Sequence, residues 1–373
     1  MVNNARGKLT IFLGSAAGAG KTYTMLSEAR QQLKAGVDVR VGYVESHGRA
    51  DTEEMIGELP VIPRRKMEYR GASFEEMDLD AVLAAHPQLV LIDEMAHTNV
   101  PGSTHRKRYQ DIETILDHGI DVWTTVNIQH LESLNDLVFE LTGVKIRETF
   151  PDGLLERADE VRLIDISPEA LIERLKAGKI YAPGKVEAAL TNFFRKTNLT
   201  ALRELALREV ADEVKEIAAA EEQLPAQASS EKIMVCVRPK SNAQRLIRRA
   251  WRMAKRLNAG LVVAYVKTSP RWGGKGDGQN SDEERERIKS LHDLSDILGA
   301  DFIELTSPDA ASGIIDVARE RKVSQIFMGR PRSLNPFSHG RNTLLYRIMS
   351  ELKDVDVHVI SEDPREVPAE DGE

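Results

Sequence analysis

Residues 8–26 read KLTIFLGSAAGAGKTYTML, which is an apolar run, a turn rich in glycine and alanine, and then a helical stretch. The apolar run predicts a buried strand, and the residues from Lys21 onward predict a helix. A strand that enters a helix through a glycine-rich turn is typical of a parallel α/β sheet, in which the backbone N–H groups of the turn are free to bind an anion. The stretch therefore predicts both an α/β fold and a place where phosphate binds.

The turn departs in one position from the phosphate-binding pattern G-x-x-x-x-G-K-[ST]. The pattern asks for glycine at position 15, where this chain has Ser15, and the glycine lies one residue earlier. Phosphate requires only small residues there, so we predict a nucleotide-binding loop; the alternative is an ordinary strand-to-helix turn with a chance Lys-Thr pair. The predicted cofactor-binding residues are Gly14, Ser15, Ala16, Ala17, Gly18, Ala19, Gly20, Lys21, Thr22 and Tyr23.

A second stretch, LVLIDE at residues 89–94, supplies the carboxylates that such a loop needs. Lys21 is expected to reach the β- and γ-phosphates, and Thr22 is expected to bind Mg²⁺. Asp93 would act on the same Mg²⁺ through a bound water, whereas Glu94 would orient or deprotonate the attacking group. The predicted catalytic residues are thus Lys21, Asp93 and Glu94, and the metal residues are Thr22 and Asp93; the alternative for Glu94 is a surface salt bridge.

The rest of the first half repeats the same alternation. Apolar runs at residues 39–44, 87–94, 121–127 and 159–166 predict strands separated by helices, and therefore a mainly parallel sheet. Residues 198–222 are helical throughout and carry an apolar stripe, which predicts a helix that packs on the domain or, alternatively, a dimerising coil. The stripe consists of Leu199, Leu202, Leu205, Val210, Val214 and Ile217.

Polar residues follow several of these strands, where open α/β sheets bind ligands. Their histidines match no zinc-ligand spacing. The basic turn at residues 106–108 includes either a charge-stabilising arginine or only solvated side chains. The residues at strand ends are Glu45, His47, Arg49, His97, Thr98, Asn99, Asn127, Gln129 and His130.

The 373 residues are long for one core, and the composition indicates a second domain. We expect a first domain at 1–222, a polar linker at 223–231, a smaller α/β sandwich at 232–363 and a disordered acidic tail at 364–373. The five strands of the sandwich are expected at residues 233–237, 261–266, 302–305, 325–329 and 355–360.

A basic helix is expected at residues 243–257. Between Arg238 and Arg256 there are 8 Lys or Arg residues and no acid. Five arginines share one face of this helix, and Leu246, Ile247, Ala250, Ala254 and Leu257 share another. The basic face is either solvated or binds an anionic ligand or partner along residues 245–256; its members are Arg245, Arg248, Arg249, Arg252 and Arg256.

Overall composition excludes several classes of protein. One cysteine allows no disulfide within the chain, no apolar run is long enough for a membrane helix, and the N-terminus lacks a signal-peptide core. These features predict a cytoplasmic protein. The net charge of −8 argues against a nucleic-acid binder.

Five stretches of the first domain resemble the N-terminal sensor domain of the KdpD family of potassium-responsive sensor kinases. They are IFLGSAAGAGKTYTML, VGYVESHGRADTE, LVLIDEMAHTNVPGS, RYQDIETILDHGIDVWTTVNIQHLESLND and LRELALREVADEV, within residues 8–220. The family's loop also has glycine at the position of Gly14 and a small residue at that of Ser15. The resemblance implies ATP and Mg²⁺ as cofactors, and the potassium pump or Kdp signalling proteins as partners.

The second domain resembles the universal-stress-protein-like module of the same family. ATP-binding members of that superfamily carry glycines after the fourth strand, whereas this chain has Gly329 followed by Arg332, Asn342 and Thr343 at the matching positions. The turn that binds cyclic di-AMP in some KdpD proteins reads RPK here, at residues 238–240. The resemblance therefore implies neither ligand for this module.

KdpD proteins continue into membrane helices and a histidine-kinase core, which these residues lack. We expect either an excised fragment or a naturally short form, which by itself is not a histidine kinase. The leading hypothesis is an ATP-binding regulator of the Kdp potassium system that transfers phosphoryl to water or to a protein Ser or Thr. A non-catalytic ATP-gated switch is the alternative, a nucleic-acid binder is a third, and homodimerisation through the 198–222 helix stays open.

Overall fold

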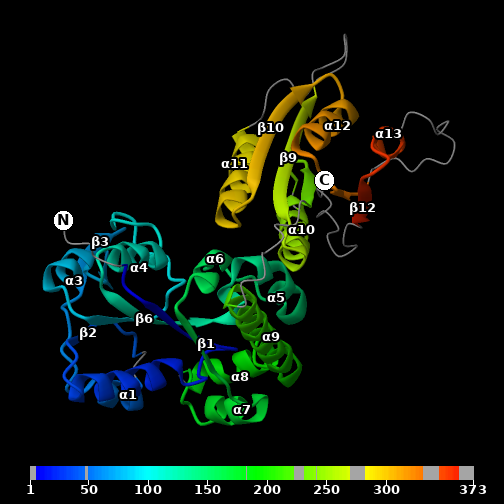
Figure 1. The fold of residues 1–373 in the computed structure, drawn as a ribbon. Coiled ribbons are helices and arrows are strands. Elements are labelled where there is room, and N and C mark those ends of the chain that lie inside the picture. The colour runs from blue at the N-terminus through cyan, green and yellow to red at the C-terminus, as the bar shows by residue number, and fades with distance from the viewer. Residues whose placement is uncertain are drawn as a thin grey trace. The chain divides into compact units, whose positions relative to one another are not determined.

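The computed structural model describes residues 6–46, 49–181, 183–221, 231–240, 242–268, 282–330 and 344–360. The chain divides into two compact units, Met1–Glu221 and Glu222–Glu373 (Figure 1). The predicted linker at 223–231, apart from residue 231, and the predicted tail lie outside the described residues, as does His47.

A parallel sheet of five strands forms the first unit, in the order β2-β5-β6-β1-β7. Its strands fall where the sequence predicts them, with ends that differ by at most two residues, so the predicted α/β fold is confirmed. The sheet contains β1 (Leu9–Gly14), β2 (Val39–Tyr43), β5 (Leu89–Ile92), β6 (Asp121–Asn127) and β7 (Glu160–Ile164).

Helices cover both faces of this sheet (Figure 1). Because strand side chains alternate between faces, Phe12 packs with α1 (Lys21–Lys34) on one side, while Ile11 and Leu13 pack toward α4 (Arg108–Asp117) on the other. The remaining short elements are α2 (Ala50–Ile56), α3 (Leu79–Ala85), η1 (Ile128–His130), η2 (Glu132–Leu134), α5 (Asn135–Thr142), α6 (Asp152–Glu156), α7 (Pro168–Lys176) and α8 (Pro183–Thr191).

The long helix α9 (Lys196–Glu221) ends the first unit. Its side chains Leu199, Leu202, Leu205 and Ala206 are buried against the first unit. Leu199 packs with Leu171 of α7, whereas the other three belong to the core on the α4 side of the sheet. This half of the helix packs on its own domain, as one of the two interpretations predicts. The side chains of Val214 and Ile217 are not among those described, so the coil alternative remains a prediction for the second half.

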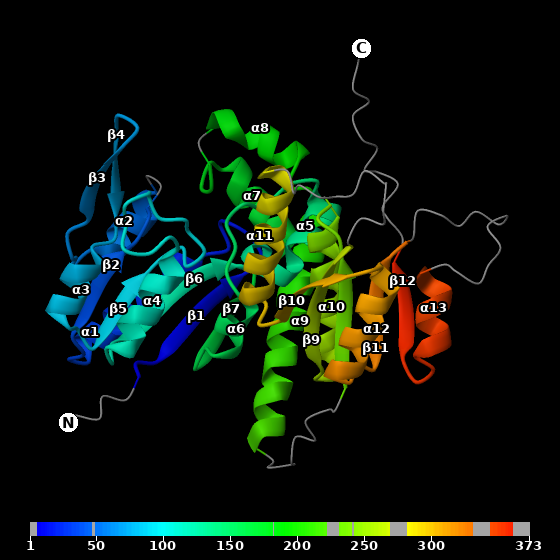
Figure 2. The same ribbon diagram turned by 90° about the horizontal axis from the view of Figure 1, so that it is seen from above.

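One hairpin was not expected from the sequence. Strands β3 (Arg65–Tyr69) and β4 (Ala72–Glu76) pair antiparallel across a turn at Arg70 and Gly71, which both have positive φ. That combination is the one a two-residue type I′ turn requires. Figure 2 shows the hairpin extending from the sheet.

The second unit is another parallel sheet of five strands, in the order β10-β9-β8-β11-β12. Helices α10 (Ala243–Leu257) and α11 (Asp282–Ile297) pack on one face, and α12 (Ala310–Arg321) and α13 (Leu344–Glu351) on the other. Its strands are β8 (Lys232–Val237), β9 (Gly260–Thr268), β10 (Asp301–Ser307), β11 (Gln325–Gly329) and β12 (Asp356–Ile360).

The basic helix α10 has a narrower apolar face than predicted. Leu257 is 39% exposed rather than buried, because the helix ends there and Asn258 turns the chain in a left-handed conformation. Arg249 and Arg256 are exposed, whereas the other three arginines of the predicted basic face are half-buried. Binding of an anionic partner along residues 245–256 remains a prediction.

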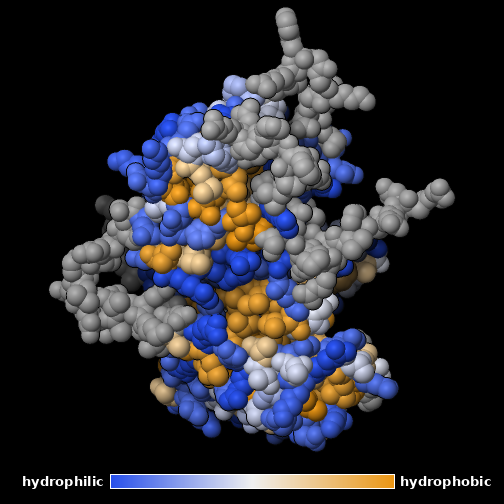
Figure 3. All heavy atoms as spheres, turned by 90° about the vertical axis from the view of Figure 1, so that its right-hand side faces the viewer, coloured by the Kyte–Doolittle hydropathy of each residue, from blue (hydrophilic) through white to orange (hydrophobic). Residues whose placement is uncertain are grey.

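None of the helices in the described part of the chain is both long and apolar enough to cross a membrane. On the face drawn in Figure 3, hydrophobic patches are set among hydrophilic residues.

A candidate nucleotide site

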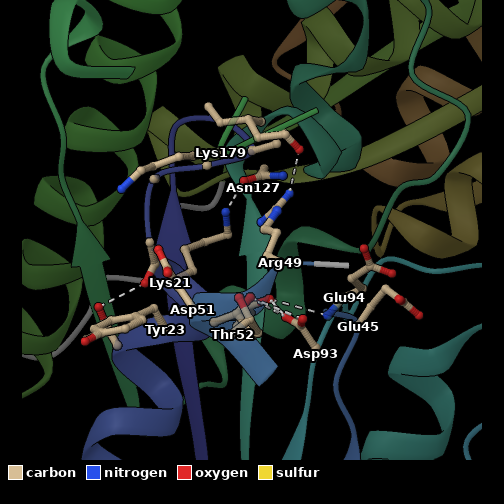
Figure 4. Close-up of a pocket in the computed structure, with 18 of the residues that line it drawn as sticks. Lys21, Tyr23, Glu45, Arg49, Asp51, Thr52, Asp93, Glu94, Asn127 and Lys179 are labelled. Carbon is tan, nitrogen blue, oxygen red and sulfur yellow. Dashed lines mark hydrogen bonds between the residues drawn. The ribbon is translucent and has the colours of Figure 1, made fainter. Parts of the chain in front are cut away.

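A cavity of about 970 Å³ opens at the carboxyl ends of the strands in the first unit. The register explains why the predicted residues meet there: Gly14 of β1 lies beside Asn127 of β6, and Ile92 of β5 lies beside Thr124. The residues that follow these strands therefore surround one space, and Figure 4 shows several of their side chains directed into it. Of the ten predicted cofactor-binding residues, the cavity is lined by Ala17, Gly18, Ala19, Gly20, Lys21, Thr22 and Tyr23.

Two glycines of the loop have backbones that other residues rarely adopt. Gly18 has a φ of 86° and Gly20, the residue that caps α1, has a φ of 102°. A Cβ on Gly18 would also lie 2.3 Å from Cδ1 of Ile180. Both positions therefore require glycine, and the result is a turn whose backbone approaches the cavity closely.

The structure also explains the irregular spacing of the loop. A Cβ on Gly14 would lie 2.9 Å from Cδ of Lys21, because the lysine stem packs over this residue. Ser15 is buried and, like Gly14 and Ala16, does not line the cavity. A glycine is thus needed under the lysine at position 14, whereas position 15 needs only a small residue.

Lys21 lies deep in the cavity. Its Nζ donates hydrogen bonds to the carbonyl oxygen of Ala16, at 3.2 Å, and to Oδ1 of Asn127. The pKa of Lys21 is lowered to about 8, chiefly by burial; the negative charge of Asp93 opposes this shift and the positive charge of Arg49 contributes to it. A buried ammonium with so little compensating charge is suited to an anionic ligand.

Thr22 and Asp93 meet across the cavity. The Thr22 hydroxyl lies 3.1 Å from Oδ1 and 3.2 Å from Oδ2 of Asp93, and Thr125 donates to the same carboxylate. Burial, followed by the negative charge of Glu94, raises the pKa of Asp93. A nearby cation would favour the ionised carboxylate, so this hydroxyl–carboxylate pair fits Mg²⁺, which prefers oxygen ligands.

Glu94 occupies a strained backbone position. Its φ is 57°, which is rare for a residue with a Cβ, and its side chain is 40% exposed in the cavity. The backbone N–H of Glu94 lies 3.4 Å from the Thr125 hydroxyl. Strain of this kind is concentrated at functional sites.

Arg108 is not a solvated residue, so that interpretation is wrong for it; its guanidinium lies 3.9 Å from the Glu94 carboxylate but does not line the cavity, and a charge-stabilising role stays a prediction. Its side chain is fully buried and donates to the carbonyl oxygen of Asp93, at 3.2 Å, and to Glu76, at 3.1 Å. The guanidinium also lies 3.8 Å from the centre of the Tyr43 ring. Arg108 therefore supports the backbone between the two predicted carboxylates from below.

The polar residues predicted at strand ends separate into two groups. Glu45, Arg49, His97, Asn127 and His130 line the cavity. The other described residues of this set, Thr98, Asn99 and Gln129, do not line it; Thr98, for example, accepts a hydrogen bond from Lys107 at 2.8 Å.

One wall of the cavity was missed by the sequence reasoning. Arg174 of α7 donates to the carbonyl oxygen of Gly18 at 2.9 Å, and Arg49 donates to that of Ile180 at 3.2 Å. Tyr181 follows and packs edge-on against Phe194. Arg174, Ile180 and Tyr181 match no motif, and Arg174 lies 156 positions after Gly18, so only the tertiary structure brings them to the site beside Arg49.

Comparison with known proteins assigns both halves of the chain. A family described as "Osmosensitive K+ channel His kinase sensor domain" (KdpD) matches residues 5–214, and the universal stress protein family matches residues 229–349. A Synechocystis sp. protein that carries the KdpD sensor-protein name is 43% identical, over 95% of this chain and 94% of its own length.

Other relatives are longer. The sensor protein KdpD of Escherichia coli is 45% identical over 88% of this chain but only 36% of its own length. For the KdpD of Mycobacterium tuberculosis the identity is 42%, over 96% of this chain and 41% of the relative. A solved universal stress protein in complex with cAMP covers 35% of this chain at 16% identity and a TM-score of 0.25, a similarity that supports no inference about a ligand.

Proposed function

This chain belongs to the KdpD sensor family, and we propose on that basis that its first domain binds Mg-ATP in the cavity at the ends of β1, β5 and β6. The observation that carries the proposal is the meeting of Thr22 with Asp93 beside the buried ammonium of Lys21. A hydroxyl, a carboxylate and a lysine at the start of a helix are the groups that hold magnesium and nucleotide phosphates in loop-based nucleotide sites.

The charges of the site support a polyphosphate as the ligand. Lys21 would contact the β- and γ-phosphates, and the N-terminus of α1 would add its partial positive charge. Thr22 and Asp93 would hold Mg²⁺, which neutralises part of the charge of the phosphates. Together these groups would offset the cost of burying Lys21.

We further propose that the bound ATP undergoes phosphoryl transfer, with Glu94 as the group that orients or deprotonates the acceptor. Glu94 faces the cavity from a strained backbone next to Asp93. The acceptor is water or the hydroxyl of a protein Ser or Thr. In either case the acceptor oxygen forms a bond to the γ-phosphorus, the bond to ADP breaks with its electron pair on the ADP oxygen, and the acceptor proton passes to Glu94.

Membership of the KdpD sensor family supports a role of this chain in the Kdp potassium-sensing system. We propose that the chain regulates potassium transport by binding the potassium pump or other Kdp signalling proteins. A protein kinase that acts on this transport machinery is the enzymatic form of the proposal.

The alternative is a switch in which ATP is bound but not consumed. Two hydrogen bonds favour this form. Arg174 of α7 donates to the phosphate loop at Gly18, and Arg49, which follows β2, donates to Ile180, so both hold the segment that includes α7 and Ile180 at the cavity. A ligand in the loop would bias the position of that segment without any chemistry.

Binding is tested with Lys21→Ala and a matched control, Lys34→Ala, at the exposed end of the same helix. We expect Lys21→Ala to abolish measurable ATP binding in calorimetry and Lys34→Ala to leave it unchanged. Equal ATP affinity of the wild type and Lys21→Ala would show that the site is elsewhere.

Chemistry is tested with Glu94→Gln and with Glu58→Gln, an exposed control. Incubation with γ-labelled ATP and the purified pump should give labelled phosphate or labelled protein with the wild type and the control. Glu94→Gln should bind ATP but release and transfer no label. ATP that stays intact with the wild type would favour the switch.

A further inference from the structure

Four cationic side chains line the cavity near the phosphate loop, although a single lysine satisfies the sequence motif. They are Lys21, Arg49, Arg174 and Lys179, and they come from four separate positions in the first unit. Arg174 already donates to the carbonyl oxygen of Gly18, so it supports the loop itself. Arg49 differs from it because its guanidinium extends into the cavity toward Lys21, as Figure 4 shows.

The guanidinium of Arg49 has a hydrogen-bond partner at one terminal nitrogen but none at Nε among the residues that the structure describes. Arg49 is the residue that caps α2, and the terminal nitrogen donates to the carbonyl oxygen of Ile180 at 3.2 Å. The Nε atom is buried. A buried N–H without a partner is costly, and an acceptor in the cavity would remove that cost.

Two cations that share a small space repel one another. The charge of Arg49 contributes to the lowered pKa of Lys21, after the larger effect of burial. The arrangement is stabilised when several negative charges lie between the two groups, as with a triphosphate. A surface arginine without this role would be expected to point into solvent.

The topology places Arg49 opposite Lys21. Lys21 follows β1 and Arg49 follows β2, and β5 and β6 lie between these two strands in the sheet. A terminal phosphate near Asp93 and Glu94, which follow β5, would have the lysine on one side and the arginine on the other.

We propose that Arg49 is a second phosphate-binding residue of this site, which contacts the terminal phosphate and stabilises the charge that develops on it during transfer. The inference rests on the proposed binding of ATP. An arginine suits this role because its planar guanidinium donates to two phosphate oxygens at once and stays charged at any physiological pH. In the transfer step the guanidinium gains and loses no proton, because Glu94 takes the proton of the acceptor.

The test compares ATP with ADP, which lacks the terminal phosphate. In Arg49→Ala we expect ATP affinity to fall at least about tenfold and ADP affinity less than about threefold, with single-turnover phosphoryl transfer slowed about a hundredfold or more. Arg49→Lys should recover part of the ATP affinity, since it restores the charge, but little of the rate. The control Arg40→Ala removes a surface arginine of β2 that pairs with Asp38 and should change nothing.

Three outcomes separate this inference from the proposed function. If neither the wild type nor Lys21→Ala binds ATP, the proposed function fails and the inference fails with it. A second outcome is that the wild type binds ATP and Lys21→Ala does not, but Arg49→Ala lowers the affinities for ATP and ADP equally or leaves both unchanged. Arg49 would then line the cavity without contacting the terminal phosphate. If thermal unfolding shows that Arg49→Ala is less stable than the wild type, the comparison of ATP and ADP affinity is repeated with Arg49→Gln, and that result decides. If the wild type binds ATP but transfers no phosphoryl group, the comparison of ATP and ADP affinity alone decides whether Arg49 contacts the terminal phosphate.

Discussion

Lys21 is the residue whose chemistry depends most on the state of the site. Its pKa of about 8 means that near pH 8 only about half of the molecules carry the ammonium. Phosphate oxygens favour the charged form, so a bound nucleotide should raise this pKa again. Binding is then coupled to proton uptake, and affinity should fall as the pH rises through 8.

Calorimetry at pH 8 in two buffers of different ionisation enthalpy measures this coupling. We expect the apparent binding enthalpies to differ by an amount that corresponds to uptake of up to about half a proton, because the free site starts half-deprotonated. At pH 6.5 Lys21 is already charged and the two buffers should agree. Lys21→Arg, which cannot lose its proton in this range, should remove the difference at pH 8. Equal enthalpies at pH 8 in the wild type would contradict the prediction.

Gly18 and Gly20 make different demands on the loop, although both have positive φ. A methyl group on Gly18 would overlap Ile180, whereas the nearest atom to one on Gly20 would be 3.5 Å away. We expect Gly18→Ala to lower the free energy of unfolding by about 2–4 kcal/mol and Gly20→Ala by about 1 kcal/mol, as measured in urea. Combining Gly18→Ala with Ile180→Ala should cost less than the sum of the two single changes; strict additivity would show that the overlap is relieved in another way.

The main residues of the candidate site could be predicted from the sequence because local rules place them. Lys21 and Thr22 follow from the loop motif, and Asp93 and Glu94 from the end of an apolar strand. Arg49 was noted only as a polar residue after a strand, and Ile180 and Tyr181 were not noted at all. Their positions depend on how α7 and the following segment pack on the phosphate loop, which no local pattern records.

At the level of elements, inner strands such as β1 and β5 were predictable because they are buried on both faces and read as apolar runs. The outer strands β7, β10 and β12 are only partly buried, and their alternating apolar residues still predict strands. The hairpin of β3 and β4 was not, since nine of its ten strand positions are exposed or half-buried, and Glu76 alone is buried. Glu76 is held there by Arg108, His97 and the backbone N–H of Val100. The hairpin is thus fixed by buried polar contacts rather than by an apolar face.

Helix α9 offers a test of the packing interpretation. Leu202 is fully buried against the first domain, whereas Leu207 on the same helix is 44% exposed. We expect Leu202→Ala to lower the free energy of unfolding by about 2–5 kcal/mol and the control Leu207→Ala by less than about 0.5 kcal/mol. Chemical denaturation measures both changes. A loss for Leu207→Ala as large as that for Leu202→Ala would contradict the packing interpretation.

The whole molecule contains two parallel sheets, each with helices on both faces, but the candidate site belongs to one of them. All the residues that line the cavity lie between positions 17 and 181. In the second unit, the segment after β11 that would match the ATP loop of universal stress proteins falls largely outside the described residues. Two glycines of that loop are replaced by Arg332 and Asn342, and this departure from the pattern predicts that the unit binds no ATP.

Hydrogen exchange of the intact chain with and without Mg-ATP tests that division. Bound Mg-ATP should slow the exchange of amides in three places: the phosphate loop, the residues after β5 and the wall around Ile180. The reason is that bound phosphates accept hydrogen bonds from these amides or close the cavity over them. The ends of β8, β9 and β11 in the second unit should exchange at unchanged rates. Lys21→Ala provides the control, since any protection that persists in this variant arises at another site. Protection at the ends of β8 and β11 that survives Lys21→Ala would show that the second unit binds ATP despite its missing glycines.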